Sequence, residues 1–318
     1  MNLKSLTTLF IILFSNSLLA QDHAGVIVKI KGKSELFTQP SKTLSAGQTQ
    51  KVLFEGLYYS VEPIKLGTKV TPGSVVRTGA DAKLRLVYKN GDQVTVGPAT
   101  SYQIIVGAKK TEDEKSSIKL MYGAIRSVVS KEGPRSGMNV KTRTAAMGVR
   151  GTDFFISQRG SSGNTRVAVL RGEVEVKPKD KNDVLNVKSG FTAAVVENKN
   201  DIKAEVKQTT QQELISIQKD SLIKTSEAEV DSASDAVKAE IAQLEKKATD
   251  VTLNDIKRYD EKLYNKLKTV AVKSVDELNT LSVKKIFKDA PKNQGKISSE
   301  DLENLEMDAY EEFFKVQN

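Results

Sequence analysis

The chain has 318 residues, no cysteine, no tryptophan and a single histidine, His23. This inventory excludes a thiol nucleophile, a disulfide framework, a Cys/His metal cluster and a histidine-based catalytic triad, so we expect no enzyme, no cofactor and no metal. The net charge of +9 is unevenly distributed: residues 21–200 carry +13 and residues 201–318 carry −5. The length allows two domains, and the charges predict a basic domain followed by an acidic one.

Residues 1–20 are predicted to be a secretory signal peptide. Lys4 supplies the positive start, residues 6–14 the apolar stretch, and Ala20 precedes the expected cleavage site. The apolar stretch is shorter than the roughly 20 residues that a membrane helix needs, so an uncleaved anchor is the weaker alternative. We therefore expect a periplasmic or secreted protein whose mature form has no membrane span, which argues against nucleic acid as a partner.

Short strands separated by glycine turns are predicted from about residue 25 to residue 196. Residues 82–89 alternate between apolar and polar side chains, and Asn90-Gly91 then predicts a hairpin with a type I′ turn. Strands of four to seven residues at spacings near ten favour an all-β sandwich or roll. We assign an N-terminal β segment to residues 21–65 and a β domain to residues 66–200.

Residues 205–318 have a different pattern and are predicted to be helical. Thr210 and Glu213 have the spacing of a capping box, as do Ser274 and Glu277. Apolar residues recur every three, four or seven positions, and a last acidic helix is expected at residues 299–316. The pattern fits a helical bundle, with a coiled-coil arm that mediates homo-oligomerisation as the alternative.

Seven short elements of the β region resemble, in order, those of the FecR domain family. They are Pro72–Gly79, Ala82–Asp92, Val96–Tyr102, Ile118–Ala124, Gly148–Phe154, Leu170–Val176 and Val187–Phe191. The resemblance implies a compact exported β domain. The best-known members of the family pass a signal from an outer-membrane transporter to a sigma factor, but we expect this chain to have neither their cytoplasmic segment nor their internal membrane helix.

The candidate binding or structural site is the stretch around Gly148, Arg150, Gly151, Thr152 and Phe154. The two glycines are expected to adopt backbone angles that other residues resist, and Thr152 to bridge the turn. The Arg150 guanidinium either binds a carboxylate or phosphate of a partner or, as we favour, donates to carbonyl groups of the turn. Phe154 and its neighbour Phe155 should point to opposite faces of the strand.

Three weaker candidates accompany this stretch. Arg126, Arg135 and Arg143 could join Arg150 in a basic patch. A charged loop contains carboxylates that lack an opposing partner, so it is not expected to be catalytic; they are Glu112, Asp113 and Glu114. A set of tyrosines suggests a surface for cell-wall carbohydrate; they are Tyr58, Tyr59, Tyr88, Tyr102 and Tyr122.

The sequence therefore predicts a non-enzymatic envelope protein that binds or scaffolds a partner, either an envelope protein or a cell-wall polymer. Two alternatives remain open. The chain could sense the occupancy of an envelope partner and relay it through the helical tail, or it could bind peptidoglycan or another cell-wall carbohydrate.

Overall fold

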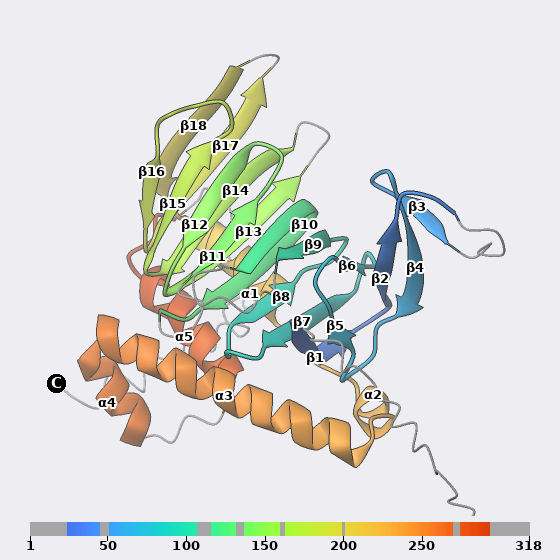
Figure 1. The fold of residues 1–318 in the computed structure, drawn as a ribbon. Coiled ribbons are helices and arrows are strands. Elements are labelled where there is room, and N and C mark those ends of the chain that lie inside the picture. Colours follow the sequence, from blue (N-terminus) through green and yellow to red (C-terminus); the bar gives the residue numbers. More distant parts are fainter. Residues whose placement is uncertain are drawn as a thin grey trace, which may run out of the picture.

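The structure is a computed structural model that describes residues 24–44, 51–106, 116–131, 137–159, 163–198, 201–269 and 274–292. Within these residues the chain forms strands β1 to β18 and then helices α1 to α5 (Figure 1). A β-rich chain with a C-terminal helical region is thus confirmed. The predicted signal peptide and the predicted helix at residues 299–316 lie outside the described residues.

Gly123 bends the long strand β10 (Ser116–Val129) and folds the strands into two halves. Residues before Gly123 pair with β9 (Ser101–Val106) and in parallel with β11 (Met138–Lys141), whereas residues from Gly123 onward pair with β8 (Gln93–Val96) and β13 (Thr152–Arg159). Gly123 has φ +93°, and an added Cβ would lie 2.2 Å from Thr100 Oγ1. Only glycine therefore fits at this bend.

Half A contains, in spatial order, β5 (Lys69–Val70), β1 (Gly25–Lys31), β7 (Lys83–Tyr88), β8, β10, β13, β14 (Asn164–Arg171), β17 (Phe191–Asn198) and β18 (Asp201–Gln208). Half B contains β3 (Val52–Phe54), β4 (Leu57–Pro63), β2 (Ser34–Ser41), β6 (Val75–Thr78), β9, β10, β11, β12 (Ala145–Val149), β15 (Glu173–Pro178) and β16 (Leu185–Lys188). The main apolar core draws residues from both halves, including Leu86 and Phe154 from half A and Val76, Ile118 and Val176 from half B. The finer assignment of a sandwich or roll stays a prediction.

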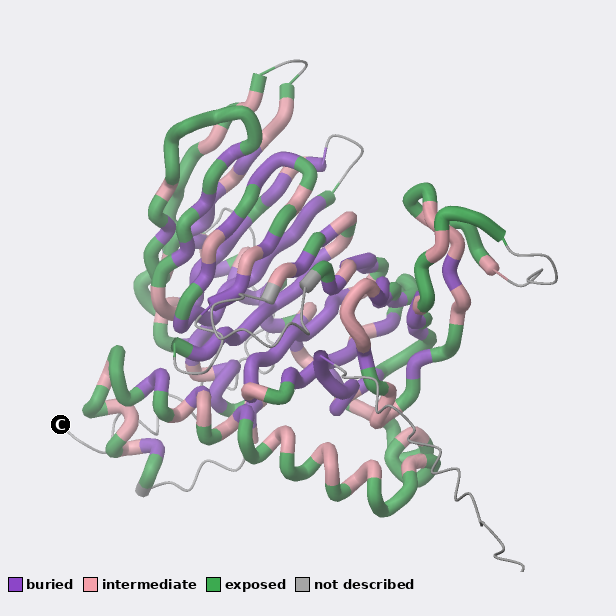
Figure 2. Tube along the Cα trace, in the orientation of Figure 1, coloured by how far each residue is buried: buried purple, intermediate pink, exposed green. Residues whose placement is uncertain are grey.

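The helices cover the other face of half A, which would otherwise be exposed. They are α1 (Gln211–Ser221), α2 (Glu227–Asp231), α3 (Asp235–Tyr259), α4 (Glu261–Thr269) and α5 (Val275–Phe287). Phe155 and Leu170 of half A pack against Leu214 of α1 and Phe287 of α5, and Val87 packs against Ala248 of α3. Figure 2 shows buried residues continuing from the strands into the helices that face them. The apolar stripe of α3 is thus used partly within the chain.

Two expected boundaries change. Residues 201–208 form strand β18, which pairs with β17, so the helices begin at Gln211 and not at residue 205. Charged residues alternate with Ile202, Ala204 and Val206 in β18, which is a strand pattern that the expected boundary overlooked. The boundary expected between residues 65 and 66 falls inside half A, because β1 pairs with β7.

The local signals were mostly confirmed. Thr210 and Glu213 form a capping box, and Ser274 caps α5 by accepting a hydrogen bond from the Glu277 amide. The hairpin at Asn90-Gly91 is present, but the turn is not type I′, because Gly91 has φ +93° while Asn90 is not in the positive-φ region. The Tyr88 amide donates to the Asp92 carbonyl, and the Gly91 amide donates to the Tyr88 carbonyl. A three-residue loop therefore closes the hairpin.

Candidate functional site

The predicted site lies where β12 passes into β13. Gly151 has φ +66°, as expected of a glycine in a tight turn, and an added Cβ would lie 2.8 Å from the Lys131 Cβ and 3.2 Å from the Tyr259 hydroxyl. Gly148 differs, because it is a strand residue that pairs with Asn139 and Glu175 and has no positive φ. The expectation of unusual backbone angles was thus right for Gly151 and wrong for Gly148.

Thr152 and Phe154 fix the start of β13 in the core. The buried Thr152 hydroxyl lies 2.9 Å from the carbonyl of Glu173 and 3.1 Å from that of Arg150, so it bridges the turn to β15. Phe154 is fully buried between the two halves. Phe155 points the opposite way, toward α1 and α5, as the alternation of a strand requires.

Arg150 is exposed, and its guanidinium makes no hydrogen bond or ion pair with a residue that the structure describes. Its carbonyl, not its side chain, contributes to the turn, by accepting from Thr152. The favoured expectation that the guanidinium donates to the turn carbonyls is therefore wrong. The side chain is positioned to meet solvent or a partner.

The expected basic patch does not assemble. Arg126 is buried and forms a pair of hydrogen bonds with Asp153, whereas Arg143 is exposed beside Glu197. Arg135 lies outside the described residues, as do Glu112, Asp113 and Glu114. Of the five tyrosines, three have their rings in the core and only Tyr122 is classed as exposed; the buried ones are Tyr59, Tyr88 and Tyr102. Among the described residues, these five tyrosines therefore do not form a shared exposed surface.

A set of charged and polar residues lies between half A and the helices, and of these the sequence analysis indicated only Arg126. We call it the ionic layer, and it comprises Lys29, Arg85, Arg126, Asp153, Asp276 and Asn279. On the α5 side, Asp276 accepts from Arg85 Nη2 at 2.5 Å and also from the Lys29 ammonium. Burial alone would raise the pKa of Asp276, but Arg85 and Lys29 outweigh burial and hold that pKa below its ordinary value.

Arg126 joins the strand of the predicted site to α5. Its Nε and Nη2 donate to the two oxygens of Asp153 at 2.9 and 2.8 Å, and its Nη2 also donates to the Asn279 carbonyl at 2.6 Å. Arg126 and Asp153 are almost completely buried, so each depends on the other for compensation of its charge. A shift of α5 would therefore remove the Asn279 carbonyl from Arg126 and uncover the buried pair.

A second connection runs from the turn itself to α3. The Tyr259 hydroxyl, in the last residue of α3, donates to the Gly151 carbonyl at 3.0 Å. Together with Phe155 and the Arg126–Asp153 pair, this bond ties three consecutive parts of the stretch 151–155 to the helices. No sequence signal links these residues, because the partners lie more than 100 positions apart.

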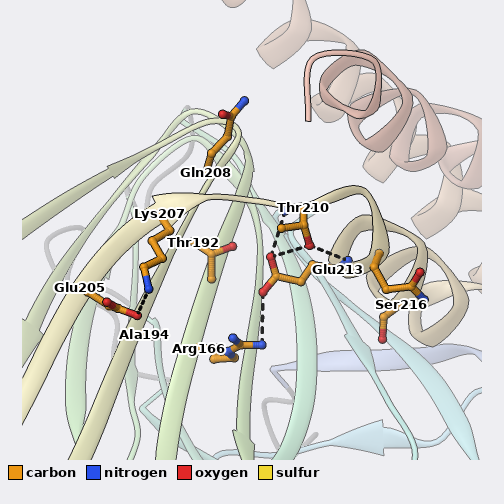
Figure 3. Close-up of a pocket in the computed structure, with 10 residues that line it drawn as sticks. Arg166, Thr192, Ala194, Glu205, Lys207, Gln208, Thr210, Glu213 and Ser216 are labelled. Carbon is orange, nitrogen blue, oxygen red and sulfur yellow. Dashed lines mark hydrogen bonds and ion pairs between the residues drawn. The ribbon is translucent and has the colours of Figure 1, made fainter. Parts of the chain in front are cut away.

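A groove of about 510 Å³ lies between β14, β17 and β18 on one side and α1 on the other. Figure 3 shows Arg166 directed at Glu213, with 3.2 Å between Nη1 and Oε1, while Glu213 also accepts from the Thr210 amide at 3.0 Å. Lys207 pairs with Glu205 at 2.8 Å beside them. The groove is lined by both the sheet and a helix, so a ligand there would contact both.

Two kinds of feature are absent from the described residues. No three His, Cys, Asp or Glu side chains among them gather into a group that could hold a metal ion. None of the described helices combines the length and the hydropathy that crossing a bilayer requires.

Comparison with known proteins gives one family match and three matching chains among solved structures. The model of the family described as FecR protein matches residues 74–175. Two solved structures of a candidate anti-sigma factor from Parabacteroides distasonis ATCC 8503 share 15% and 16% identity with the chain, with TM-scores of 0.37 and 0.38. The matches cover 44% and 45% of this chain and 62% and 64% of those chains, less than two thirds of their length.

At these values the two structures establish neither the fold nor the function of this chain. No curated protein matches it. The family match runs from the start of β6 into β15 and includes the turn at Gly151 and the bend at Gly123. The chain therefore carries a FecR domain, which occupies residues 74–175.

Proposed function

We propose that this chain is a non-enzymatic protein of the bacterial envelope that relays the occupancy of a partner from its FecR domain to its C-terminal helices. The observation that carries the proposal is the ionic layer, which joins the FecR strands β7, β10 and β13 to α5. Export by the predicted signal peptide places this relay in the periplasm, and both export and location are part of the proposal.

The chemistry of the ionic layer suits an interface that changes. Removing Arg85 and Asp276 from water costs free energy that offsets much of their attraction, so a buried ion pair is weak evidence for stability. An apolar interface of the same shape would hold the helices more firmly. The helices also pack on half A through apolar side chains, so the ionic layer is the polar part of a mixed interface.

The groove supplies a place where a partner could act on this interface. Arg166 and Glu213 face each other across it, one on β14 and the other on α1. α1 in turn packs on α5, since Gln211 donates to the Phe287 carbonyl and Gln218 to the Thr280 hydroxyl. A partner that displaces Glu213 from Arg166 would therefore shift α1, and with it α5.

Simple binding or scaffolding remains the second candidate, and Arg150 and the groove are the features that favour it. The carbohydrate hypothesis loses the support of Tyr59, Tyr88 and Tyr102, which are buried. Relay and simple binding differ in whether α5 must move.

The relay is tested by Asp276→Asn, with Asp250→Asn as the control on the exposed side of α3. Asp276→Asn removes the carboxylate that faces Arg85 and Lys29, so we expect amide hydrogen exchange in α5 to rise at least tenfold while exchange in β13 is unchanged. Asp250→Asn should leave both unchanged.

The functional measurement is the gene-expression profile of the source cell that carries each variant. A relay predicts that Asp276→Asn shifts expression of a defined set of genes, whereas Asp250→Asn does not. If α5 is released and expression is unaltered, the relay is rejected and binding without signalling becomes the function.

A further inference from the structure

β18 is a long strand at the edge of half A with one free side. Its eight residues pair with β17, and no other described strand pairs with it. The other edge strands of the described sheet are short: β5 has two residues, β3 has three and β16 has four. A long edge strand offers unpaired N–H and C=O groups to another chain, and most proteins shorten or cover such edges.

The charges of β18 are self-complementary in one antiparallel register. With Ala204 opposite Ala204 of a second copy, Asp201 faces Lys207 and Lys203 faces Glu205. Because the register is symmetric, each of these two pairs occurs twice. Shifting the register by two residues places Lys203 opposite Lys203 or Glu205 opposite Glu205, and like charges in direct opposition are destabilising.

The apolar residues of β18 agree with the same register. Ile202 and Ala204 are partly buried and pack against the main core, whereas Val206 remains 38% exposed. In the symmetric register Ile202 lies opposite Val206 of the second copy. Pairing would therefore cover Val206 and extend the core of one molecule into the other.

From these observations we propose that two copies of this chain associate through antiparallel pairing of their β18 strands, with the twofold axis at Ala204. A strand pair is self-complementary, so the assembly closes as a dimer and does not propagate. The existing ion pairs of Asp201 with Lys181 and of Glu205 with Lys207 involve exposed side chains, which can turn toward the second copy without loss of buried contacts. Glu205 and Lys207 also line the groove beside α1, but the proposed pairing uses the edge of β18 that faces away from β17 and requires no movement of α5, so it does not depend on the relay.

The register is tested by single cysteines, because the chain has none of its own. In antiparallel strands, directly opposite residues have Cα atoms about 4.5–5.5 Å apart, which suits a disulfide. Full-length Ala204→Cys should therefore form a disulfide-linked dimer on mild oxidation. Val206→Cys should not, because its two copies would be four residues apart along the strand, about 13 Å.

The charges are tested by reversal, with the mass of the full chain in solution measured by light scattering at several concentrations. Lys203→Glu alone and Glu205→Lys alone should each weaken the dimer at least tenfold, and the double variant should restore it. Melting temperatures establish that all three variants are folded. A wild-type monomer at every concentration, equal cross-linking at positions 204 and 206, or a double variant no better than the single ones would overturn the proposal.

Discussion

Gly151 and Arg150 are adjacent, yet the fold depends on them in opposite ways. The backbone of Gly151 occupies the left-handed region and its carbonyl accepts from Tyr259, whereas the side chain of Arg150 extends into solvent. Turn conformation can be predicted from a local pattern, because it depends on a few neighbouring residues. The direction in which an arginine points depends on what surrounds it.

Gly151→Ala is expected to destabilise the protein by about 1–2 kcal/mol, because alanine is unfavourable at this φ and its Cβ would meet Lys131 and Tyr259. Gly148→Ala should change the free energy of unfolding by less than about 0.5 kcal/mol, since only Glu175 Oε2 lies near, at 3.6 Å. Chemical denaturation measures both. Gly190→Ala, with φ +84° and open space, separates backbone strain from the contact with Tyr259.

Arg150→Ala is expected to leave the melting temperature unchanged within the error of the measurement, because the side chain is exposed and makes no contact that stabilises the turn. Loss of the cellular response with an unchanged melting temperature would identify Arg150 as a recognition residue. A clearly lower melting temperature would show that its guanidinium supports the turn after all.

At the scale of elements, Asp92 connects the β7–β8 hairpin to the end of β10. Its carboxylate is buried and accepts from the Asn90 side chain and from the Ser130 amide, each at 2.7 Å. Burial raises the pKa of Asp92 to about 6, the nearby charge of Asp255 adds to the increase, and the two hydrogen bonds oppose it. The folded chain thus binds this proton more tightly than the unfolded chain.

This pKa predicts how stability depends on pH. The contribution of Asp92 to the free energy of unfolding is fully present below a pH of about 4. It is lost as the pH rises through the folded-state pKa of about 6, by roughly 3 kcal/mol in all. The unfolding free energy of Asp92→Asn relative to wild type should therefore increase by a similar amount between pH 4 and pH 7. A difference that stays flat across this range would contradict the raised pKa.

At the scale of the whole molecule, the helices lie on half A, where Asp276 meets Lys29 and Arg85. The helical layer, the FecR strands and the groove consequently form one connected structure. The proposed relay depends on this connection, and the proposed dimer places two such molecules edge to edge through β18.

The sequence by itself determined the features that depend on neighbouring residues. They include the alternating strands, the glycine turn at Gly151, the hairpin at Gly91, the cap at Thr210 and the ordered motifs of the FecR domain. Each depends on backbone angles or on hydrogen bonds spanning a few residues. Such interactions leave a pattern that can be recognised without the rest of the chain.

Only the tertiary structure decided what covers the outer face of half A. In sequence, Arg85 alternates with Leu84 and Leu86 and resembles a solvent-exposed residue, yet it is 2% exposed beneath Asp276, 191 positions away. Alternation tells which side chains share a face of a strand, but it does not tell whether water or a helix lies over that face. For that reason the ionic layer, the burial of Arg126 and the free edge of β18 became visible only in the folded chain.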